Sequence, residues 1–207
     1  MVTRNGVYLA GVIVSIVALA LTISSIASPR WISYRVLDPA GGIVVDASIG
    51  LHQRCKWSAG ASSSRTCGPF PGDASCDGGR ASFCSMWRTA GFLMNFAVAA
   101  ELATIAGFVL VSRNARVKRH GGWKILGFML VVVAAAQFLS MAVVVSHAYL
   151  FDHDDLFLVP GYYLDSSWYL CLSSAIIALL CAFGLAIAAY ALPPEDGYQF
   201  LHDSSDV

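Results

Sequence analysis

The sequence predicts a mainly α-helical membrane protein: a four-transmembrane-helix bundle with a small disulfide-tied extracellular antiparallel β-sheet in its first outer loop. Three observations predict this fold class. Of the 207 residues, 57% are hydrophobic and only 13% are charged, whereas soluble domains carry about 25% charged residues. Four segments are long and apolar enough to cross a bilayer, which takes about 20 residues per helix. A polar stretch between the first two segments contains four of the six cysteines.

The four predicted spans are apolar and rich in small residues. They cover residues 7–27, 89–111, 123–150 and 168–192, and the last one stops before Pro193 and Pro194. Small residues let helices approach one another closely in lipid. They occur in all four spans, notably as Gly11, Gly91, Gly107, Gly127 and Gly184. We therefore predict one packed domain over residues 1–207 and not four separate anchors.

The first span has an alternative interpretation as a cleaved signal peptide, because Arg4 precedes it and small residues end it. The apolar core of a signal peptide usually has about 7–15 residues. The segment 7–27 is longer and contains no clear A-x-A cleavage site. A retained helix is therefore the favoured interpretation.

The basic residues predict the orientation, since cytosolic links between spans carry an excess of Lys and Arg. The link 112–122 and its borders hold Arg113, Arg116, Lys118, Arg119 and Lys124, which predicts that this link is cytosolic. Four spans then place both termini, including the tail 193–207, in the cytosol, and the loops 28–88 and 151–167 outside. The long outer loop also contains seven basic residues, but long loops count less in this rule.

The first outer loop contains four cysteines, Cys55, Cys67, Cys76 and Cys84. Disulfides persist on the outer side of a membrane, and four cysteines allow three pairings. We favour the pairs Cys55–Cys67 and Cys76–Cys84, because each closes a short local loop. Cys171 and Cys181 lie within the fourth span and are expected to be buried thiols.

Two segments of the same loop have the composition of strands. Residues 31–37 (WISYRVL) and 42–55 (GIVVDASIGLHQRC) are rich in β-branched and aromatic residues, and Pro39 and Gly41 separate them, which predicts a hairpin. Residues 60–66 (GASSSRT) are predicted to form a turn whose base is held by Cys55 and Cys67. A sheet of this size is marginally stable alone, and a disulfide typically contributes about 2–4 kcal/mol. We therefore expect the disulfides to replace a hydrophobic core.

The loop residues also show a family resemblance. Trp31 follows the first span, Gly50 and Leu51 come nineteen residues later, and Cys55 and Cys67 follow. This order resembles the W…GLW…C…C signature of the claudin, peripheral myelin protein and LHFPL-like tetraspan superfamily, and Arg88 resembles the basic residue before its second span. His52 stands where the signature has its second Trp. With the second cysteine pair and the sequence FCSMWR at 83–88, the chain resembles fungal claudin-like proteins of the Sur7/PalI type, or LHFPL-like proteins, more than ordinary claudins.

The resemblance implies that Trp31, Gly50 and Leu51 anchor an outer sheet on the helix bundle. The tryptophans also allow a simpler interpretation, because Trp is enriched at membrane interfaces. Four of them lie at span ends, namely Trp31, Trp87, Trp123 and Trp168. We expect both interpretations to hold, so that these residues also form interfacial belts.

Glu101 is the one acidic residue within a span, and an intramembrane carboxyl group is a functional candidate by default. The structural alternative is a carboxyl group that is protonated or hydrogen-bonded to a neighbouring helix, through partners such as Gln137 or Ser140. A proton relay would need a second polar group within reach, and Asn95 does not share the helical face of Glu101. The structural alternative is favoured.

The other patterns point away from enzyme chemistry, and we expect no catalytic residue, cofactor or metal. The sequence contains no G-x-S-x-G, H-E-x-x-H or phosphate-binding loop. His147 and the acids of residues 151–157 (FDHDDLF) match no calcium loop. A membrane thiol oxidoreductase would usually have a close reactive pair such as C-x-x-C, which is absent. The spans lack the interruptions by Gly and Pro that are typical of carriers.

The expected function is that of a non-enzymatic claudin-like protein of the plasma membrane. It would act through its outer sheet and helix bundle in membrane organisation, cell-surface contact or self-assembly. The expected partners are membrane lipids, other membrane proteins or a second copy of the chain. Nucleic acid is not expected, because 13 basic and 13 acidic residues balance. The alternatives are an accessory subunit of a larger membrane enzyme or channel and, less favoured, the oxidoreductase.

The tail contains two short patterns. Residues 198–201 (YQFL), from Tyr198 to Leu201, match the Tyr-x-x-bulky pattern of endocytic sorting signals. The end of the chain, from Ser205 to Val207, resembles a ligand of PDZ domains, which capture a terminal carboxylate with backbone amides.

Overall fold

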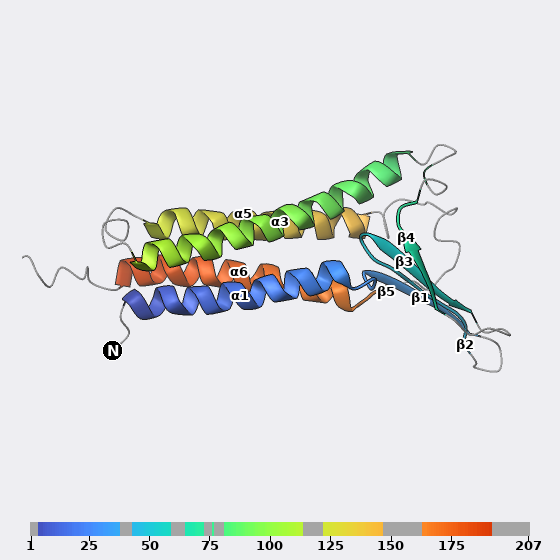
Figure 1. The fold of residues 1–207 in the computed structure, drawn as a ribbon, viewed down its shortest axis with the longest axis horizontal. Helices are drawn as coiled ribbons and strands as arrows, with labels where there is room; N and C mark the ends of the chain where they lie inside the picture. Colours follow the sequence, from blue (N-terminus) through green and yellow to red (C-terminus); the bar gives the residue numbers. More distant parts are fainter. Residues whose placement is uncertain are drawn as a thin grey trace, which may run out of the picture.

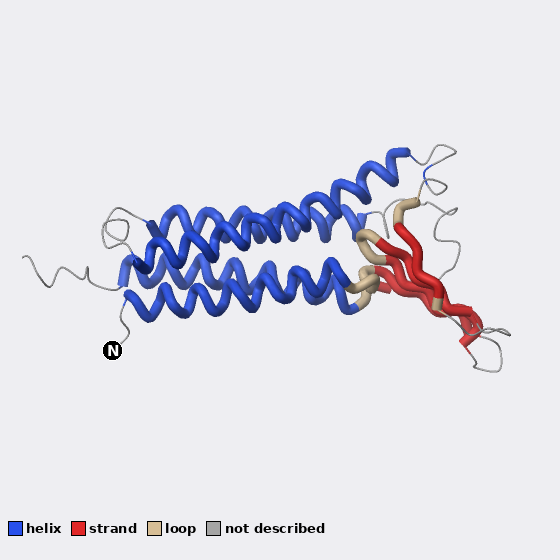
Figure 2. Tube along the Cα trace, viewed as in Figure 1, coloured by secondary structure: helices blue, strands red, loops and turns tan. Residues whose placement is uncertain are grey.

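The computed structural model describes residues 4–37, 43–58, 65–72, 76, 81–113, 122–146 and 163–191. It confirms the predicted fold class, because long helices form a bundle and a small antiparallel sheet with two disulfides lies at one end of it (Figure 2). The helices are α1 (Arg4–Ala27), α3 (Ala81–Arg113), α5 (Gly122–Val145) and α6 (Ser166–Ala191). The strands are β1 (Ile32–Leu37), β2 (Ile43–Ile49), β3 (Gln53–Ser58), β4 (Thr66–Pro69) and β5 (Tyr163–Leu164).

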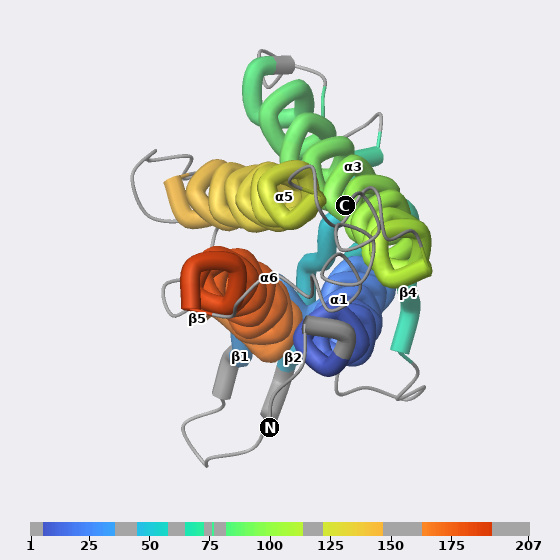
Figure 3. Tube along the Cα trace, turned by 90° about the vertical axis from the view of Figure 1, so that its left-hand side faces the viewer, coloured from blue at the N-terminus to red at the C-terminus, as the bar shows by residue number. Residues whose placement is uncertain are grey.

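The four helices pack side by side. Helix α1 contacts α3 and α6, and α5 contacts the same two neighbours, so that the four axes form a square when seen from the end (Figure 3). Each helix is long and apolar enough to cross a membrane. Many large apolar side chains on the outside of the bundle are exposed, among them Phe92, Phe128 and Phe183. An outer surface of this kind suits lipid and not water, and the chain therefore has the structure of a multi-pass membrane protein.

Helix α3 is longer than the predicted span. It begins at Ala81 and has 33 residues, which corresponds to about 50 Å at 1.5 Å per residue, against about 30 Å for the hydrocarbon core of a bilayer. Its first turns extend beyond the other helices, above the sheet (Figure 1). The part of α3 before residue 89 was not predicted, because the apolar run in the sequence begins only near that residue.

The sheet has the strand order β4-β3-β2-β1-β5, and all neighbouring strands are antiparallel. The predicted hairpin is β1 with β2. The predicted turn, residues 60–66, falls between β3 and β4, and residues 60–64 lie outside the described part of the chain. Strand β5 was not predicted. It has two residues from the segment between α5 and α6 and pairs with Ile32 and Ser33 of β1, so the sheet includes residues from that segment and from the segment between α1 and α3.

The hydrophobic core divides into two clusters along the bundle. One lies at the sheet end and contains Trp31, Phe83 and Trp87; the other surrounds Phe108, against which Tyr8 packs edge-on with the ring centres 6.5 Å apart. Trp31 and Trp87 are fully buried. The expectation that they belong to interfacial belts is therefore wrong for these two, because their rings face protein on every side.

Glycines permit close contact at only some of the predicted positions. A Cβ atom added at Gly11 would lie 2.5 Å from Cε1 of Phe108, and one at Gly107 would lie 2.9 Å from Cδ2 of Leu126. At Gly127 and Gly184 an added Cβ would meet nothing within 4 Å, so at these two positions the prediction is wrong.

Gly50 is the most tightly enclosed position at the junction of sheet and bundle. A Cβ atom there would lie 2.6 Å from the Cα of Pro29 and 3.3 Å from the carbonyl oxygen of Ser28. Both atoms belong to the backbone that leaves α1, and backbone cannot rotate away as a flexible side chain can.

We expect Gly50→Ala to lower the stability of the protein by about 1–3 kcal/mol, the usual cost of forcing an extra group into a packed site. The matched control is Gly68→Ala, where the added Cβ meets nothing within 4 Å. Thermal unfolding in mild detergent measures both. Equal melting temperatures for the two variants would show that the contact with Pro29 relaxes without cost.

Candidate functional site

The sheet is mounted on the bundle by the last carbonyl groups of α1. The final carbonyls of a helix have no partner within the helix and must be satisfied from outside. The indole Nε1 of Trp31 donates to the carbonyl of Ser25 at 2.9 Å, and Nε2 of Gln53 donates to the carbonyl of Ala27 at 3.2 Å. The hydroxyl of Ser167, on α6, donates to the carbonyl of Ser28 at 3.0 Å. Sheet and α6 together therefore close the end of α1.

Backbone hydrogen bonds around Trp31 tie the same elements together. Its N–H donates to the carbonyl of Ile49 at 3.0 Å, and its carbonyl accepts from the N–H of Asp165 at 3.1 Å. The next bond links the N–H of Ser167 to the carbonyl of Arg30 at 3.0 Å. Trp31 lies directly before β1, and its backbone hydrogen bonds link that point of the chain to the end of β2 and to the residue before α6.

An aromatic cluster joins the extension of α3 to the sheet. Phe70, just after β4, packs edge-on against Phe83 and Trp87, with ring centres 6.2 Å and 5.3 Å apart. Phe83 and Trp87 stack at 5.6 Å. The sequence signal for this cluster is the spacing of four residues between Phe83 and Trp87, which places both on one face of a helix.

The two disulfides are Cys55–Cys67 and Cys76–Cys84, which confirms the favoured pairing. Cys55 and Cys67 are directly opposite each other in the β3–β4 ladder, so this bond fastens the outermost strand to the sheet. Cys84 lies in the first turns of α3 and is buried. The second disulfide therefore fastens the connection after β4 to the extended helix.

The predicted structural residues do not all lie together. Trp31, Leu51 and Cys84 belong to one buried cluster, and Gly50 and Cys55 are buried beside it. Cys67 and Arg88 are exposed. His52, which replaces the second Trp of the signature, reaches α3: a Cβ added at Gly91 would lie 3.0 Å from its Cε1.

A second polar site lies inside the bundle, at Glu101. Its Oε1 accepts hydrogen bonds from the hydroxyl of Thr22 at 2.9 Å and from Nε2 of Gln137 at 3.1 Å. The hydroxyl of Ser174 lies 3.4 Å from Oε1 and 2.8 Å from that of Thr22. One residue from each of the four helices thus meets at the carboxyl group. We call this set the four-helix network.

The four-helix network differs in part from the sequence interpretation. Gln137 is a partner of Glu101, whereas Ser140 donates instead to the carbonyl of Ala90 at 3.1 Å. Thr22 and Ser174 were missed, because serine and threonine recur in all the spans. Within the part of the chain that the structure describes, Oε2 of Glu101 and Oε1 of Gln137 are buried without a hydrogen-bond partner. All hydrogen bonds of the carboxyl group therefore converge on one of its two oxygens.

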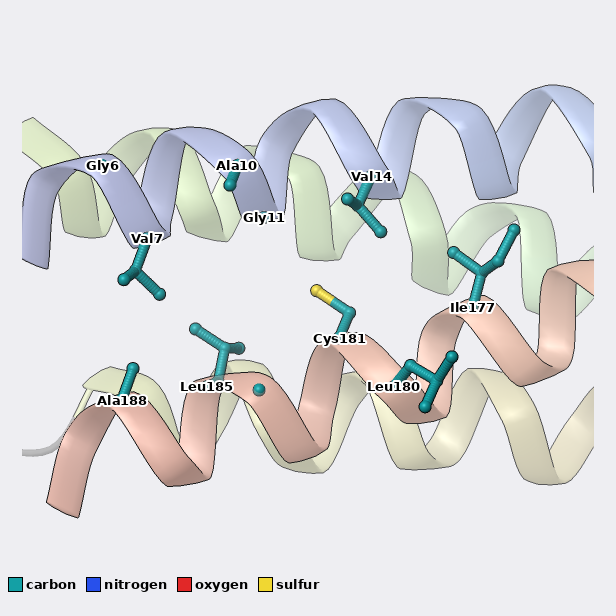
Figure 4. Close-up of a pocket in the computed structure, with 11 residues that line it drawn as sticks. Gly6, Val7, Ala10, Gly11, Val14, Ile177, Leu180, Cys181, Leu185 and Ala188 are labelled. Atoms are coloured by element: carbon teal, nitrogen blue, oxygen red, sulfur yellow. The ribbon is translucent and has the colours of Figure 1, made fainter. Parts of the chain in front are cut away.

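A groove between α1 and α6 has a volume of about 520 Å³. Val7 and Val14 of α1 face Cys181 and Leu185 of α6 across it (Figure 4). Its walls are apolar apart from the thiol of Cys181, so that they offer van der Waals contact and little chemistry.

Several predicted features lie outside the described residues. They include the tail residues Tyr198, Leu201, Ser205 and Val207, the acidic segment 151–157 with His147, and residues 114–121 of the basic link. Among the residues that the structure does describe, no group of three or more His, Cys, Asp or Glu side chains lies close enough together to hold a metal ion.

The fold and the site define a class of protein: a multi-pass helical bundle with a disulfide-tied sheet mounted at one end. No model of a known protein family matches the sequence, and no curated protein matches it significantly. The family resemblance therefore rests on the motif residues and the architecture.

Replacing Cys55 and Cys67 together by Ser is expected to cost about 2–4 kcal/mol and to reduce delivery to the cell surface. The reason is that β4 loses its covalent link to the sheet. The control is Cys181→Ala, which removes a free thiol. Unfolding in detergent and surface labelling report the result; normal stability and delivery of the double variant would contradict the role assigned to this disulfide.

Removing the acceptor of the four-helix network should destabilise the bundle. Glu101→Leu leaves Thr22, Gln137 and Ser174 without their common acceptor and should cost about 1 kcal/mol. Glu101→Gln keeps the acceptor and should cost less. Ala103→Leu, on the exposed face of α3, controls for added bulk. Unfolding in detergent ranks the variants, and a Glu101→Leu protein as stable as the parent would show that the network contributes nothing.

Proposed function

We propose that this protein is a non-enzymatic claudin-like tetraspan of the plasma membrane, with both termini cytosolic and the sheet outside. It acts by contact, through its sheet and bundle, in membrane organisation, cell-surface contact or self-assembly. The order of Trp31, Gly50, Leu51, Cys55 and Cys67 supports the family, and the basic residues around 112–122 support the orientation. The partners are membrane lipids and other membrane proteins or a second copy.

The observation that carries this proposal is the exposed edge of the sheet at β4. All four residues of β4 are exposed, and among the described strands β4 pairs with β3 alone. An open edge presents unpaired N–H and C=O groups to another chain. Adding a strand to such an edge is a recurrent mode of protein recognition. If the partner is a second copy, antiparallel pairing of β4 with β4 gives a closed two-fold dimer.

The way in which β4 is attached to the rest of the protein makes its edge suitable for recognition. The Cys55–Cys67 disulfide holds β4 in register, and the aromatic cluster of Phe70, Phe83 and Trp87 holds the connection that follows. A strand that is already ordered loses little entropy when a partner binds. An accessory subunit of a larger membrane enzyme or channel would use the same edge, with a different chain as partner. The thiol oxidoreductase is less favoured, because the cysteines of the two disulfides are 12 and 8 residues apart and not in a close reactive pair.

We expect Gly68→Lys to weaken self-association by up to about fivefold. The site accepts a side chain, since an added Cβ meets nothing within 4 Å. In a two-fold pair it would place like charges across the strands, which costs up to about 1 kcal/mol. Energy transfer between two differently tagged copies at equal surface density measures the effect.

The control is Ser85→Lys, which adds the same charge on the exposed face of α3 near the sheet. It should leave association unchanged. Cross-linking in intact membranes followed by mass spectrometry identifies other neighbours. If Gly68→Lys changes neither self-association nor any cross-link, β4 is not the contact edge and the proposed function loses its support.

A further inference from the structure

A polar pocket of about 410 Å³ lies on one face of the sheet. Ser33, Ser48 and Trp57 line it from three neighbouring strands, at positions that the register places on the same face. Successive residues of a strand point to opposite faces. The residues next to them, Ile32 and Ile49, belong to the core cluster that contains Trp87. The pocket therefore opens on the side of the sheet that faces away from α3.

The pocket lies at the level where the helices end. Arg30, three residues after the end of α1, and Asp165, directly before the start of α6, both line it. Figure 1 shows the sheet sloping away from the bundle on the side of α1 and α6, opposite the extension of α3. When the four helices span a bilayer, this face of the sheet lies over the lipid headgroups that surround α1 and α6.

The charges in the pocket have both signs, with three arginines and two aspartates. Nε of Arg35 lies 3.8 Å from Oδ2 of Asp46. Asp165 accepts hydrogen bonds from the hydroxyl of Ser33 and the N–H of Ser166. Arg30 and Arg65 form no ion pair with any residue that the structure describes, although Nη2 of Arg65 donates to the hydroxyl of Ser48 at 3.0 Å. The guanidinium groups of Arg30 and Arg65 can therefore donate hydrogen bonds to a ligand in the pocket.

The remaining walls suit an interfacial ligand. Trp57 is half-buried and Tyr163 is 40% exposed. Both residue types are enriched at the level of lipid headgroups, and the faces of their rings attract ammonium groups. Arginine is well suited to phosphate, because its planar fork of donors matches the phosphate oxygens.

We propose that this pocket binds the headgroup of a zwitterionic glycerophospholipid from the leaflet on the sheet side. The guanidinium groups of Arg30 and Arg65 contact the phosphate, and the ammonium group lies against Trp57 and Tyr163. The two aspartates select against headgroups with several negative charges. This proposal goes beyond the proposed function and does not depend on pairing at β4.

The test uses the full chain in mild detergent, with bound lipid counted by native mass spectrometry. The probes are phosphatidylethanolamine and a diacylglycerol with the same acyl chains. We expect the phospholipid to bind more tightly than the diacylglycerol. The variant Arg30→Gln/Arg65→Gln should lose about tenfold of the phospholipid affinity and none of the diacylglycerol affinity, because only the phosphate contacts are removed.

Lys56→Gln is matched to Arg65→Gln, since both remove an exposed charge, one from β3 and one from directly before β4, but Lys56 lies on the opposite face of the sheet. It should leave binding unchanged. Thermal unfolding checks that every variant is folded.

Three results would overturn the proposal. The first is a double variant that binds phosphatidylethanolamine as tightly as the parent. The second is glycerophosphoethanolamine binding as tightly as the whole lipid, which would assign the pocket to a soluble phosphate compound. The third is a double variant that loses self-association and keeps lipid binding, which would assign the pocket to a protein. The Gly68→Lys measurement is independent, so failure of the lipid site and failure of the β4 contact are distinguishable.

Discussion

The structure depends on how the C-terminal end of α1 is closed. A helix that ends at a membrane surface leaves carbonyl groups without partners, and here the donors come from Trp31, Gln53 and Ser167. Trp31 directly precedes β1, Gln53 belongs to β3 and Ser167 belongs to α6, so closing the helix also fixes the sheet relative to two spans. The close approach of Gly50 to Pro29 follows from the same arrangement. A small sheet that would be marginal alone thereby becomes a rigid extension of the bundle.

Inside the bundle, polar contacts determine how each helix is rotated about its axis, which apolar packing does not. Lipid tails are as apolar as leucine side chains, so burial alone does not select one rotation of a helix against its neighbours. The four-helix network does select one, because Thr22, Glu101, Gln137 and Ser174 meet only when each helix turns its polar residue inward. The network therefore fixes all four helices, and the closure of α1 fixes α1 and α6 at a second level, beside the sheet.

Much of this fold could be predicted because its signals are local. The spans follow from long apolar runs, and the disulfides follow from cysteines that are 12 and 8 residues apart. The failures concern contacts between distant segments. Strand β5 has two residues, too few to show a pattern, and exists because β1 offers it an edge. The burial of Trp31 and Trp87 depends on Phe70 and on the extension of α3, and no periodicity in the spans reveals those partners.

The sheet offers two surfaces that point in different directions, and this separation matters for how it could work. The edge of β4 is exposed at the side of the sheet opposite β5. The polar pocket instead includes Arg30 and Asp165, at the base of the sheet where α1 ends and α6 begins. A headgroup bound in the polar pocket would leave β4 open to another chain. The Cys55–Cys67 disulfide and the β-ladder connect the two surfaces. A lipid that reduces the mobility of the pocket would therefore also reduce the mobility of β4. Lipid composition would then influence pairing through the order of the sheet, without any contact between the lipid and the partner.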